Sequence, residues 1–150
     1  AMKKKTILFV DDEPNILAGL RRMLRSMRKS MHFEFAENGQ AALELMAARP
    51  VDVVVSDMRM PGMDGAALLS TIQKEYPHAI RIMLTGQADD EAIMRTVGVV
   101  HQFLAKPADP DILKQEINRA SALQDLMADD RLKQLVSSVG SLPSLPETYA

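Results

Sequence analysis

Acidic side chains follow short hydrophobic segments at two places in the sequence. Asp11 and Asp12 come directly after the apolar run at residues 7–10, and Asp57 follows the valines at 53–55 and one serine. Carboxylates that crowd together repel one another unless a cation compensates their charge. Oxygen ligands without imidazole or thiolate favour Mg²⁺ over zinc or copper. These acids are therefore candidate Mg²⁺ ligands, provided that the fold brings them together.

A hydroxyl and an ammonium complete the set of candidate groups. Thr85 follows the apolar segment 80–84, and Lys106 follows the segment 99–105. Neither side chain suits Mg²⁺, but an ammonium pairs with phosphoryl oxygens and a hydroxyl can donate to them. A cation, a lysine and a hydroxyl together can stabilise a phosphoryl group in transfer. A carboxylate facing that group can attack it and form an acyl phosphate.

Each of these residues also has an ordinary structural explanation. Asp12 could cap a helix, and Asp57 could form a turn at a strand end. Thr85 is a common residue in strands, and Lys106 could simply be solvated. The functional interpretation therefore depends on whether the elements that carry these residues place them at one site.

Hydrophobic segments alternate with amphipathic ones along the chain. Runs typical of buried strands lie at residues 7–10, 33–36, 51–56, 80–84 and 99–105. Helical spacing or capping residues indicate helices over 14–27 and 41–48, after Asp64, from Asp89 or Asp90 to Met94, and from Pro110. Five such units predict an α/β, flavodoxin-like (βα)5 three-layer sandwich with a parallel sheet of order 2-1-3-4-5. Polar residues at the carboxyl ends of its strands would meet at one edge.

The composition limits the classes of function. A net charge of -2 and a pI near 5.9 argue against a protein built mainly to bind nucleic acid directly. The absence of cysteine excludes disulfides, thiolate catalysis and cysteine-ligated zinc. No apolar run approaches the ~18 residues that span a bilayer, and the run after the first lysines is too short for a signal peptide. We therefore expect a cytoplasmic protein without a membrane partner.

Four stretches of the sequence together resemble the receiver domain of two-component response regulators. They are ILFVDDEP, VVVSDMRMPGMDG, IMLTG and FLAKP, and the match covers roughly residues 4–122. The resemblance implies that Asp57 is the phosphoacceptor and also contacts Mg²⁺. It implies that Asp12 binds the metal directly, that Asp11 acts on it through water, and that the main-chain carbonyl of Arg59 completes the protein's share of the ligands.

The same resemblance implies roles for the last two strands. Thr85 would hydrogen-bond the phosphoryl group, and Lys106 would pair with it. Thr85 and Phe103 would form the switch that alters the face made by the fourth helix, fifth strand and fifth helix. The phosphoryl group would come from a sensor histidine kinase or a phosphotransfer protein. Arg59 and Gln87 flank the path of hydrolytic water in this family, so we expect them to tune the lifetime of the aspartyl phosphate.

Two other functions fit some of the same residues. One is a Mg²⁺-dependent phosphatase that uses Asp12 or Asp57 as nucleophile, although the short loops leave little material for a substrate pocket. The other is an interaction domain that works without phosphorylation, which would be expected to lack part of the acidic set or Lys106. The sequence therefore favours a phosphoacceptor switch over an enzyme that acts on external substrates.

The chain continues past residue 122, where a bare receiver domain would end. Apolar residues recur at helical spacing through residue 139, which predicts an extended C-terminal helix and a helical linker over 123–140. This linker could form a homodimer or pack back on its own domain. The stretch LPSLPETY resembles the opening of HDOD output domains, which are relatives of HD-type metal hydrolases. We therefore expect a receiver domain at 4–122 that controls an output domain, whose truncated start lies at 141–150.

Overall fold

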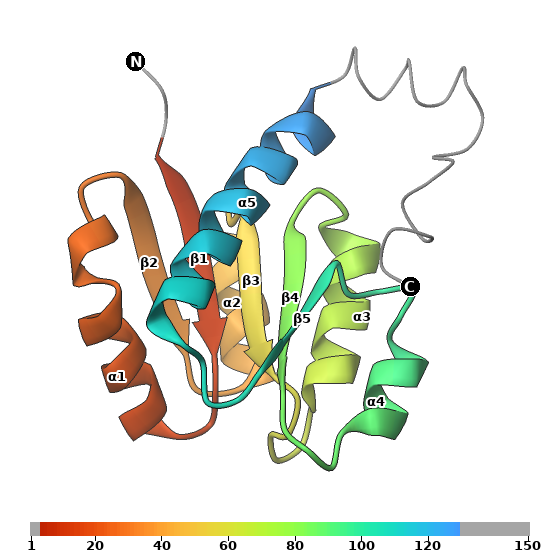
Figure 1. Cartoon of the computed structure of the whole chain (residues 1–150). Coiled ribbons are helices and arrows are strands. Elements are labelled where there is room, and N and C mark those ends of the chain that lie inside the picture. The colour runs from red at the N-terminus through yellow and green to blue at the C-terminus, as the bar shows by residue number, and fades with distance from the viewer. Residues whose placement is uncertain (1–3, 130–150) are drawn as a thin grey trace.

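Strands and helices alternate along the whole described part of the chain, residues 4–129, in the computed structural model (Figure 1). The strands are β1 (Lys5–Val10), β2 (Met31–Ala36), β3 (Val53–Asp57), β4 (Ile80–Thr85) and β5 (Gln102–Ala105). The helices are α1 (Pro14–Met23), α2 (Gly39–Ala48), α3 (Gly65–Glu75), α4 (Asp90–Arg95) and α5 (Pro110–Ala128), and a 3-10 turn, η1 (Arg25–Met27), follows α1. The alternation agrees with the predicted fold class.

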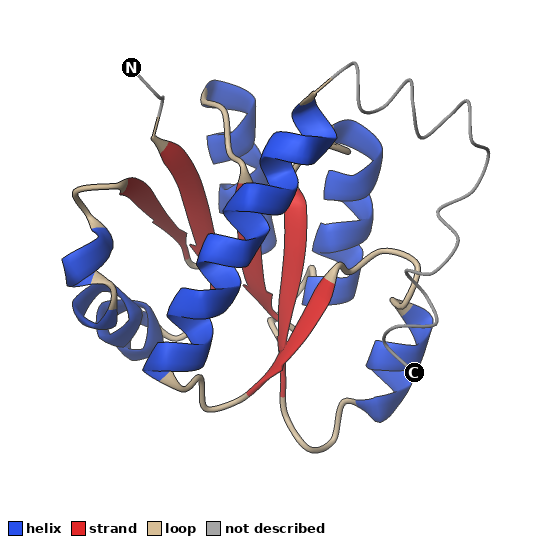
Figure 2. Ribbon diagram, turned by 45° about the horizontal axis from the view of Figure 1, so that its top comes forward, coloured by secondary structure: helices blue, strands red, loops and turns tan. Residues whose placement is uncertain are grey.

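All four strand pairings are parallel and give the order β2-β1-β3-β4-β5. Helices cover both faces of this sheet (Figure 2). One face packs against α1 and α5, and the other against α2, α3 and α4. The flavodoxin-like three-layer architecture is therefore confirmed, and the carboxyl ends of all five strands lie at one edge, at the bottom of Figure 1.

The central strand β3 is buried along its whole length. Val54 faces the cluster on the α2 and α3 side, whereas Val53 and Val55 face the α1 and α5 side. Branched side chains on both faces explain why this segment is a strand and why it occupies the middle of the sheet. Its position matters because β3 delivers Asp57 between β1 and β4.

Several element boundaries differ from the predicted ones. The strand predicted at 99–105 begins only at Gln102, because the amides of Val99 and Val100 both donate to the carbonyl of Thr96 and form a turn. The helix predicted through Met27 ends at Met23 and continues as the 3-10 turn. Apolar spacing marks the buried face of such segments, but the hydrogen-bond pattern of the ends depends on tertiary contacts.

The C-terminal helix α5 is longer than a bare domain would need, as predicted. It runs without a break past residue 122 to Ala128. Lys5 of β1 holds its last turns, with its ammonium 2.5 Å from Gln124 Oε1 and ion-paired with Asp125. The predicted linker beyond residue 129 and the predicted start of an output domain lie outside the described residues. Within residues 4–129, no helix is long and apolar enough to cross a membrane.

Candidate functional site

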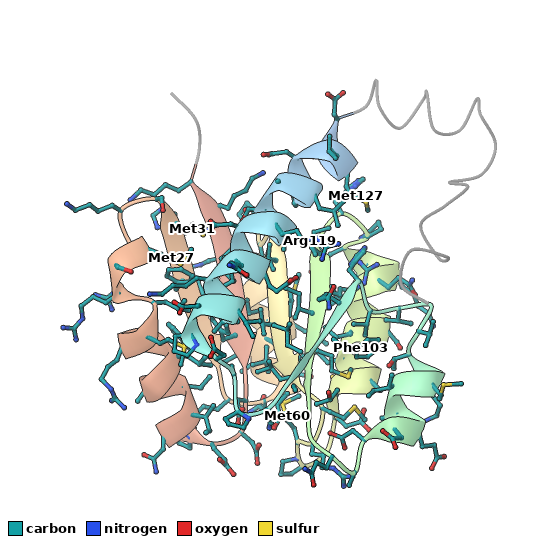
Figure 3. The ribbon with its side chains drawn as sticks, in the orientation of Figure 1. Met27, Met31, Met60, Phe103, Arg119 and Met127 are labelled. Carbon is teal, nitrogen blue, oxygen red and sulfur yellow. The ribbon has the colours of Figure 1, made fainter. Side chains whose placement is uncertain are left out.

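Three carboxylates meet where β1 and β3 end. Asp11 and Asp12 follow β1, Asp57 is the last residue of β3, and the two strands are neighbours in the sheet. Each of the three residues offers one carboxylate oxygen, and these oxygens all lie within 4.8 Å of one another. Met60, at the lower edge in Figure 3, lies in the loop that follows Asp57. The fold therefore brings together the acids on which the predicted metal site depends.

Asp11 is the most deeply buried member of this group, with 2% of its surface exposed. Its Oδ1 accepts a hydrogen bond from the Glu13 amide at 2.9 Å, while its Oδ2 has no partner among the described residues. Burial raises the pKa of Asp11, and the neighbouring Asp57 carboxylate adds to this increase against the effect of the Glu13 amide. A buried, unpartnered oxygen beside two other carboxylates fits a hard divalent cation such as Mg²⁺.

Asp12 does not cap α1. The N-cap position of this helix belongs to Glu13, whose side chain makes no capping hydrogen bond, and Pro14 fills the first turn. Asp12 is partly exposed and directs a carboxylate oxygen to the acidic group. The structural explanation that the sequence left open for Asp12 is therefore not the one the fold adopts.

Lys106 supplies the positive charge that the acids lack. Its ammonium lies 2.5 Å from Asp57 Oδ1. The Lys106 amide donates to the Thr85 carbonyl at 2.9 Å, which ties the end of β5 to the end of β4. The following peptide bond, Lys106–Pro107, is cis. The lysine predicted from the sequence thus contacts the acid that it was expected to serve.

Thr85 and Phe103 occupy the β4 and β5 side of the site. The Thr85 hydroxyl donates to the Leu104 carbonyl on β5 over 3.5 Å, a long and therefore weak hydrogen bond. Phe103 projects from β5 and is half-buried against the hydrophobic cluster shared with α3 and α4 (Figure 3). Both residues are near the predicted site, but the Thr85 hydroxyl is bound to the neighbouring strand.

Gly65 allows α3 to begin directly behind Asp57, a contact that the sequence analysis did not identify. A Cβ at this position would lie 2.3 Å from the Asp57 carbonyl oxygen and 2.9 Å from Met58 Cα. The Gly65 amide donates to the Met58 carbonyl at 2.8 Å, and Asp64 caps the helix through the Ala67 amide. The only sequence signal was a glycine after a capping acid, which has no specific link to the site.

Arg59 and Asp89 form an ion pair that joins the loops after β3 and β4. Arg59 Nε lies 2.7 Å from Asp89 Oδ1, and its Nη2 donates to the Ala88 carbonyl at 3.0 Å. Asp89 Oδ2 accepts from the Gly86 amide at 2.7 Å. Burial would raise the pKa of Asp89, but the Gly86 amide and the Arg59 guanidinium outweigh it and lower the pKa.

The sequence analysis missed this pair because it assigned Asp89 or Asp90 to the start of a helix. Asp89 does stand at the N-cap position of α4, but its side chain makes no capping hydrogen bond. A cavity of about 510 Å³ opens beside the pair, between the loop after β3 and α4. The signal that could have found the pair is an acid and a base in loops that follow adjacent strands.

Comparison with known proteins identifies one family. The profile of the response regulator receiver domain matches residues 7–118. The hydrogenase transcriptional regulatory protein HoxA of Cupriavidus necator is 33% identical over 85% of this chain and 26% of its own length. The DNA-binding transcriptional regulator NtrC of Escherichia coli is 31% identical over 99% of this chain and 32% of its own length. The chain thus spans about a quarter to a third of these curated relatives.

A solved structure extends the likeness to three dimensions. The signal receiver domain of an HD domain-containing protein from Pseudomonas fluorescens is 34% identical, with a TM-score of 0.78. That match covers 82% of this chain and 98% of the solved one. The shared part is therefore the whole of that receiver domain and the larger part of this chain.

Proposed function

Because this chain belongs to the response regulator receiver family, we propose that Asp57 is its phosphoacceptor and that the donor is a phosphohistidine on a sensor histidine kinase or phosphotransfer protein. The observation that carries this proposal is the 2.5 Å contact between Lys106 and Asp57, beside a cluster of three carboxylates. A lysine and a cation on either side of an acid favour attack by that acid on a phosphoryl group.

The acidic group would hold Mg²⁺. Asp12 and Asp57 would contribute carboxylate oxygens directly, Asp11 would act on the metal through water, and the main-chain carbonyl of Arg59 would complete the protein's share of the ligands. The unpartnered Oδ2 of Asp11 supports this assignment. When bound, Mg²⁺ supplies positive charge to the oxygens of the phosphoryl group.

The proposed reaction is an in-line displacement at phosphorus. A carboxylate oxygen of Asp57 forms a bond to phosphorus while the bond between phosphorus and the donor imidazole nitrogen breaks. The nitrogen keeps the electron pair of the broken bond, and the imidazole leaves as a neutral ring when its other nitrogen carries a proton. Lys106 would pair with the transferred group, and the hydrogen bond from its amide to the Thr85 carbonyl supports a position for both residues on the same side of the acyl phosphate.

The switch would use Thr85 and Phe103. The hydrogen bond from the Thr85 hydroxyl to Leu104 is 3.5 Å long, so it costs little to exchange for a charged phosphoryl oxygen. Movement of this residue would let Phe103 follow toward the space that it leaves. The changed surface would be the face formed by α4, β5 and α5, because β5 carries Phe103 and pairs with β4.

The chain would be the control domain of a longer protein. The proposed receiver domain covers 4–122, the helical linker 123–140, and the beginning of an output domain 141–150. An HDOD or HD-type output is supported by the stretch LPSLPETY and by the HD domain-containing protein whose receiver is 34% identical. The two curated relatives named above are transcriptional regulators, so similar receiver domains belong to proteins with different outputs. The sequence after the receiver domain therefore says more about the type of output domain than the receiver domain does. We also propose that two copies of the chain form a homodimer through the linker.

The test is incubation with acetyl phosphate and Mg²⁺, followed by intact mass. We expect the wild type to gain one phosphoryl group and the Asp57→Asn variant to gain none. Asp90→Asn is the matched control, because Asp90 is an exposed acid at the same edge of the sheet, and it should be phosphorylated like the wild type. An unmodified wild type that also fails to bind Mg²⁺ would overturn the proposal, and rapid turnover of external phosphate esters would favour the phosphatase.

A further inference from the structure

The N-terminus of α4 differs from those of the other helices that have Asp or Asn at the N-cap position. Asn38, Asp64 and Asp109 cap α2, α3 and α5, and their side chains accept first-turn amides at 2.7–3.1 Å. All three have extended backbone, with ψ of 169°, 175° and 129°. Asp89 occupies the same position before α4, yet its ψ is 15° and its carboxylate does not cap the helix. Aspartate is a preferred capping residue, and it caps α3 and α5 in this chain, but at position 89 it does not cap the helix.

The Asp89 carboxylate instead binds groups in the loops after β3 and β4, at the proposed phosphorylation site. Its two oxygens accept from Arg59 Nε and from the Gly86 amide, each at 2.7 Å. Asp89 is 5% exposed although Gly86, Gln87, Ala88 and Asp90 around it are exposed. A charged carboxylate is buried at low cost only with such charge-assisted partners, so the Gly86 amide and the Arg59 guanidinium together stabilise Asp89 in this position.

The two positions of the carboxylate exclude each other. Capping requires extended backbone at Asp89, as at the three capped helices, and the observed backbone lies far from it. Without Arg59, one buried oxygen of Asp89 would lose its cation, whereas the first-turn amides of α4 would offer replacement donors. Loss of the Arg59 contact should therefore turn Asp89 toward the helix.

We propose that Arg59 controls the N-terminus of α4 by holding Asp89 away from its capping position, and that a phosphoryl group on Asp57 releases it by drawing the guanidinium to itself. The second half rests on the proposed function. Arg59 is two residues past Asp57, and a phosphoryl group adds negative charge with three acceptor oxygens that match a guanidinium well. The released Asp89 caps α4, and the rotation of its backbone moves the loop at 86–88 that follows Thr85.

Control of α4 by Arg59 would link the site around Asp57 to an exposed surface. The helix α4 has only six residues, from Asp90 to Arg95, so the loss or gain of one cap affects most of it. It also presents Met94, whose surface is 75% exposed, and the following Val97 is 61% exposed. A change in the order of α4 would thus change the surroundings of these two exposed apolar side chains.

The deciding experiment measures amide hydrogen exchange by NMR in the unphosphorylated chain. In Arg59→Gln, we expect the Ala92 amide, third in α4, to exchange roughly fivefold more slowly, and the Gly86 amide to exchange faster. Arg95→Gln is the matched control, because Arg95 lines the same cavity and the change in charge is identical. It should leave both amides as in the wild type. Adding Asp89→Ala to Arg59→Gln should remove the slowing at Ala92.

The phosphorylated wild type provides the second arm. After treatment with acetyl phosphate and Mg²⁺, its Ala92 amide should slow as in Arg59→Gln, and Arg59→Gln should slow little further. If Arg59→Gln and Arg95→Gln behave alike without phosphorylation, the control of α4 by Arg59 is overturned, whatever intact mass shows. If the wild type gains a phosphoryl group without slowing at Ala92, release by phosphorylation is overturned. If it gains none, the proposed function fails, while the first arm still decides the role of Arg59.

Discussion

At the scale of single residues, Asp57 has one positively charged neighbour and one buried negatively charged neighbour. Lys106 brings a positive charge within 2.5 Å, while Asp11 adds a buried negative charge nearby. The Lys106 contact satisfies one charge only, and the unpartnered oxygen of Asp11 shows where compensation is incomplete. The acidic group therefore lowers the stability of the protein without a cation, and relief of this cost would favour the proposed binding of Mg²⁺.

Replacement of Asp11 should reveal this cost. We expect Asp11→Asn to raise the free energy of unfolding by roughly 1 kcal/mol in the absence of Mg²⁺, because a buried charge with one unpartnered oxygen is removed. The same variant should lose most of the increase in melting temperature that Mg²⁺ gives the wild type. Thermal unfolding with and without Mg²⁺ measures both effects.

Asp90→Asn removes a charge from an exposed acid outside the cluster and serves as the control. It should respond to Mg²⁺ as the wild type does. An Asp11→Asn variant that is less stable than the wild type without Mg²⁺, yet stabilised equally by the cation, would contradict this account of the acidic group.

At the scale of elements, one buried arginine holds β4 to the turn before β5. Arg81 is 5% exposed, and its guanidinium donates to the main-chain carbonyls of Val99, Pro77 and Ala79 at 2.7–3.3 Å. Burial lowers the pKa of Arg81. The acceptors are main-chain carbonyls rather than a carboxylate. Arg81 therefore connects chain segments before β4 and before β5 that are not joined by strand pairing.

Arg81→Met should destabilise the fold by about 2–3 kcal/mol. Methionine is long enough to fill part of the space, but it leaves the three carbonyls without their donor. Urea unfolding at pH 7 measures the loss. Arg22→Met, at an exposed position on α1, should change stability by less than about 0.5 kcal/mol. Equal effects of the two substitutions would show that the Arg81 contacts contribute nothing.

At the scale of the whole molecule, we expect the sheet to unfold as one unit with its two hydrophobic clusters, so a single partly buried titrating group affects global stability. His101 is such a group. Its Nδ1 accepts the Arg81 amide at 2.9 Å, which requires that nitrogen to be unprotonated. Burial and the charge of Arg81 lower the pKa of His101 from 6.5 to about 4.

The sign of the pH effect follows from these values. Between pH 6.5 and about pH 4 the unfolded chain binds a proton at His101 that the folded chain does not. The free energy of unfolding should therefore fall as the pH drops through this window, by about 1–2 kcal/mol at pH 5. Above pH 6.5 this residue should have no effect.

His101→Asn isolates the contribution, because asparagine keeps an acceptor for the Arg81 amide but does not titrate. Urea unfolding at pH 7.5 and pH 5 should show a larger loss for the wild type than for His101→Asn. His32 and His78 are present in both proteins, so any contribution from them cancels in the difference. The same loss in both proteins would mean that His101 takes up its proton equally in the folded and unfolded chains.

The sequence by itself determined the fold class, the strand order and the acidic site with Lys106. Alternating apolar and amphipathic segments specify a parallel sheet, and in such a sheet residues at strand ends must converge. Asp11, Asp57 and Lys106 could be predicted because Asp11 and Lys106 directly follow a strand and Asp57 is the last residue of one.

Only the tertiary structure decided the side-chain pairs between loops and turns. Arg59 and Asp89 are 30 residues apart, and Arg81 and Val99 are 18 apart. Neither pair leaves a periodic or local signal in the sequence, because a loop side chain has many partners within reach until the backbone of both segments is in place. Asp89 shows the limit clearly: a local rule made it a helix cap, and the presence of Arg59 across the site gave its carboxylate a stronger partner.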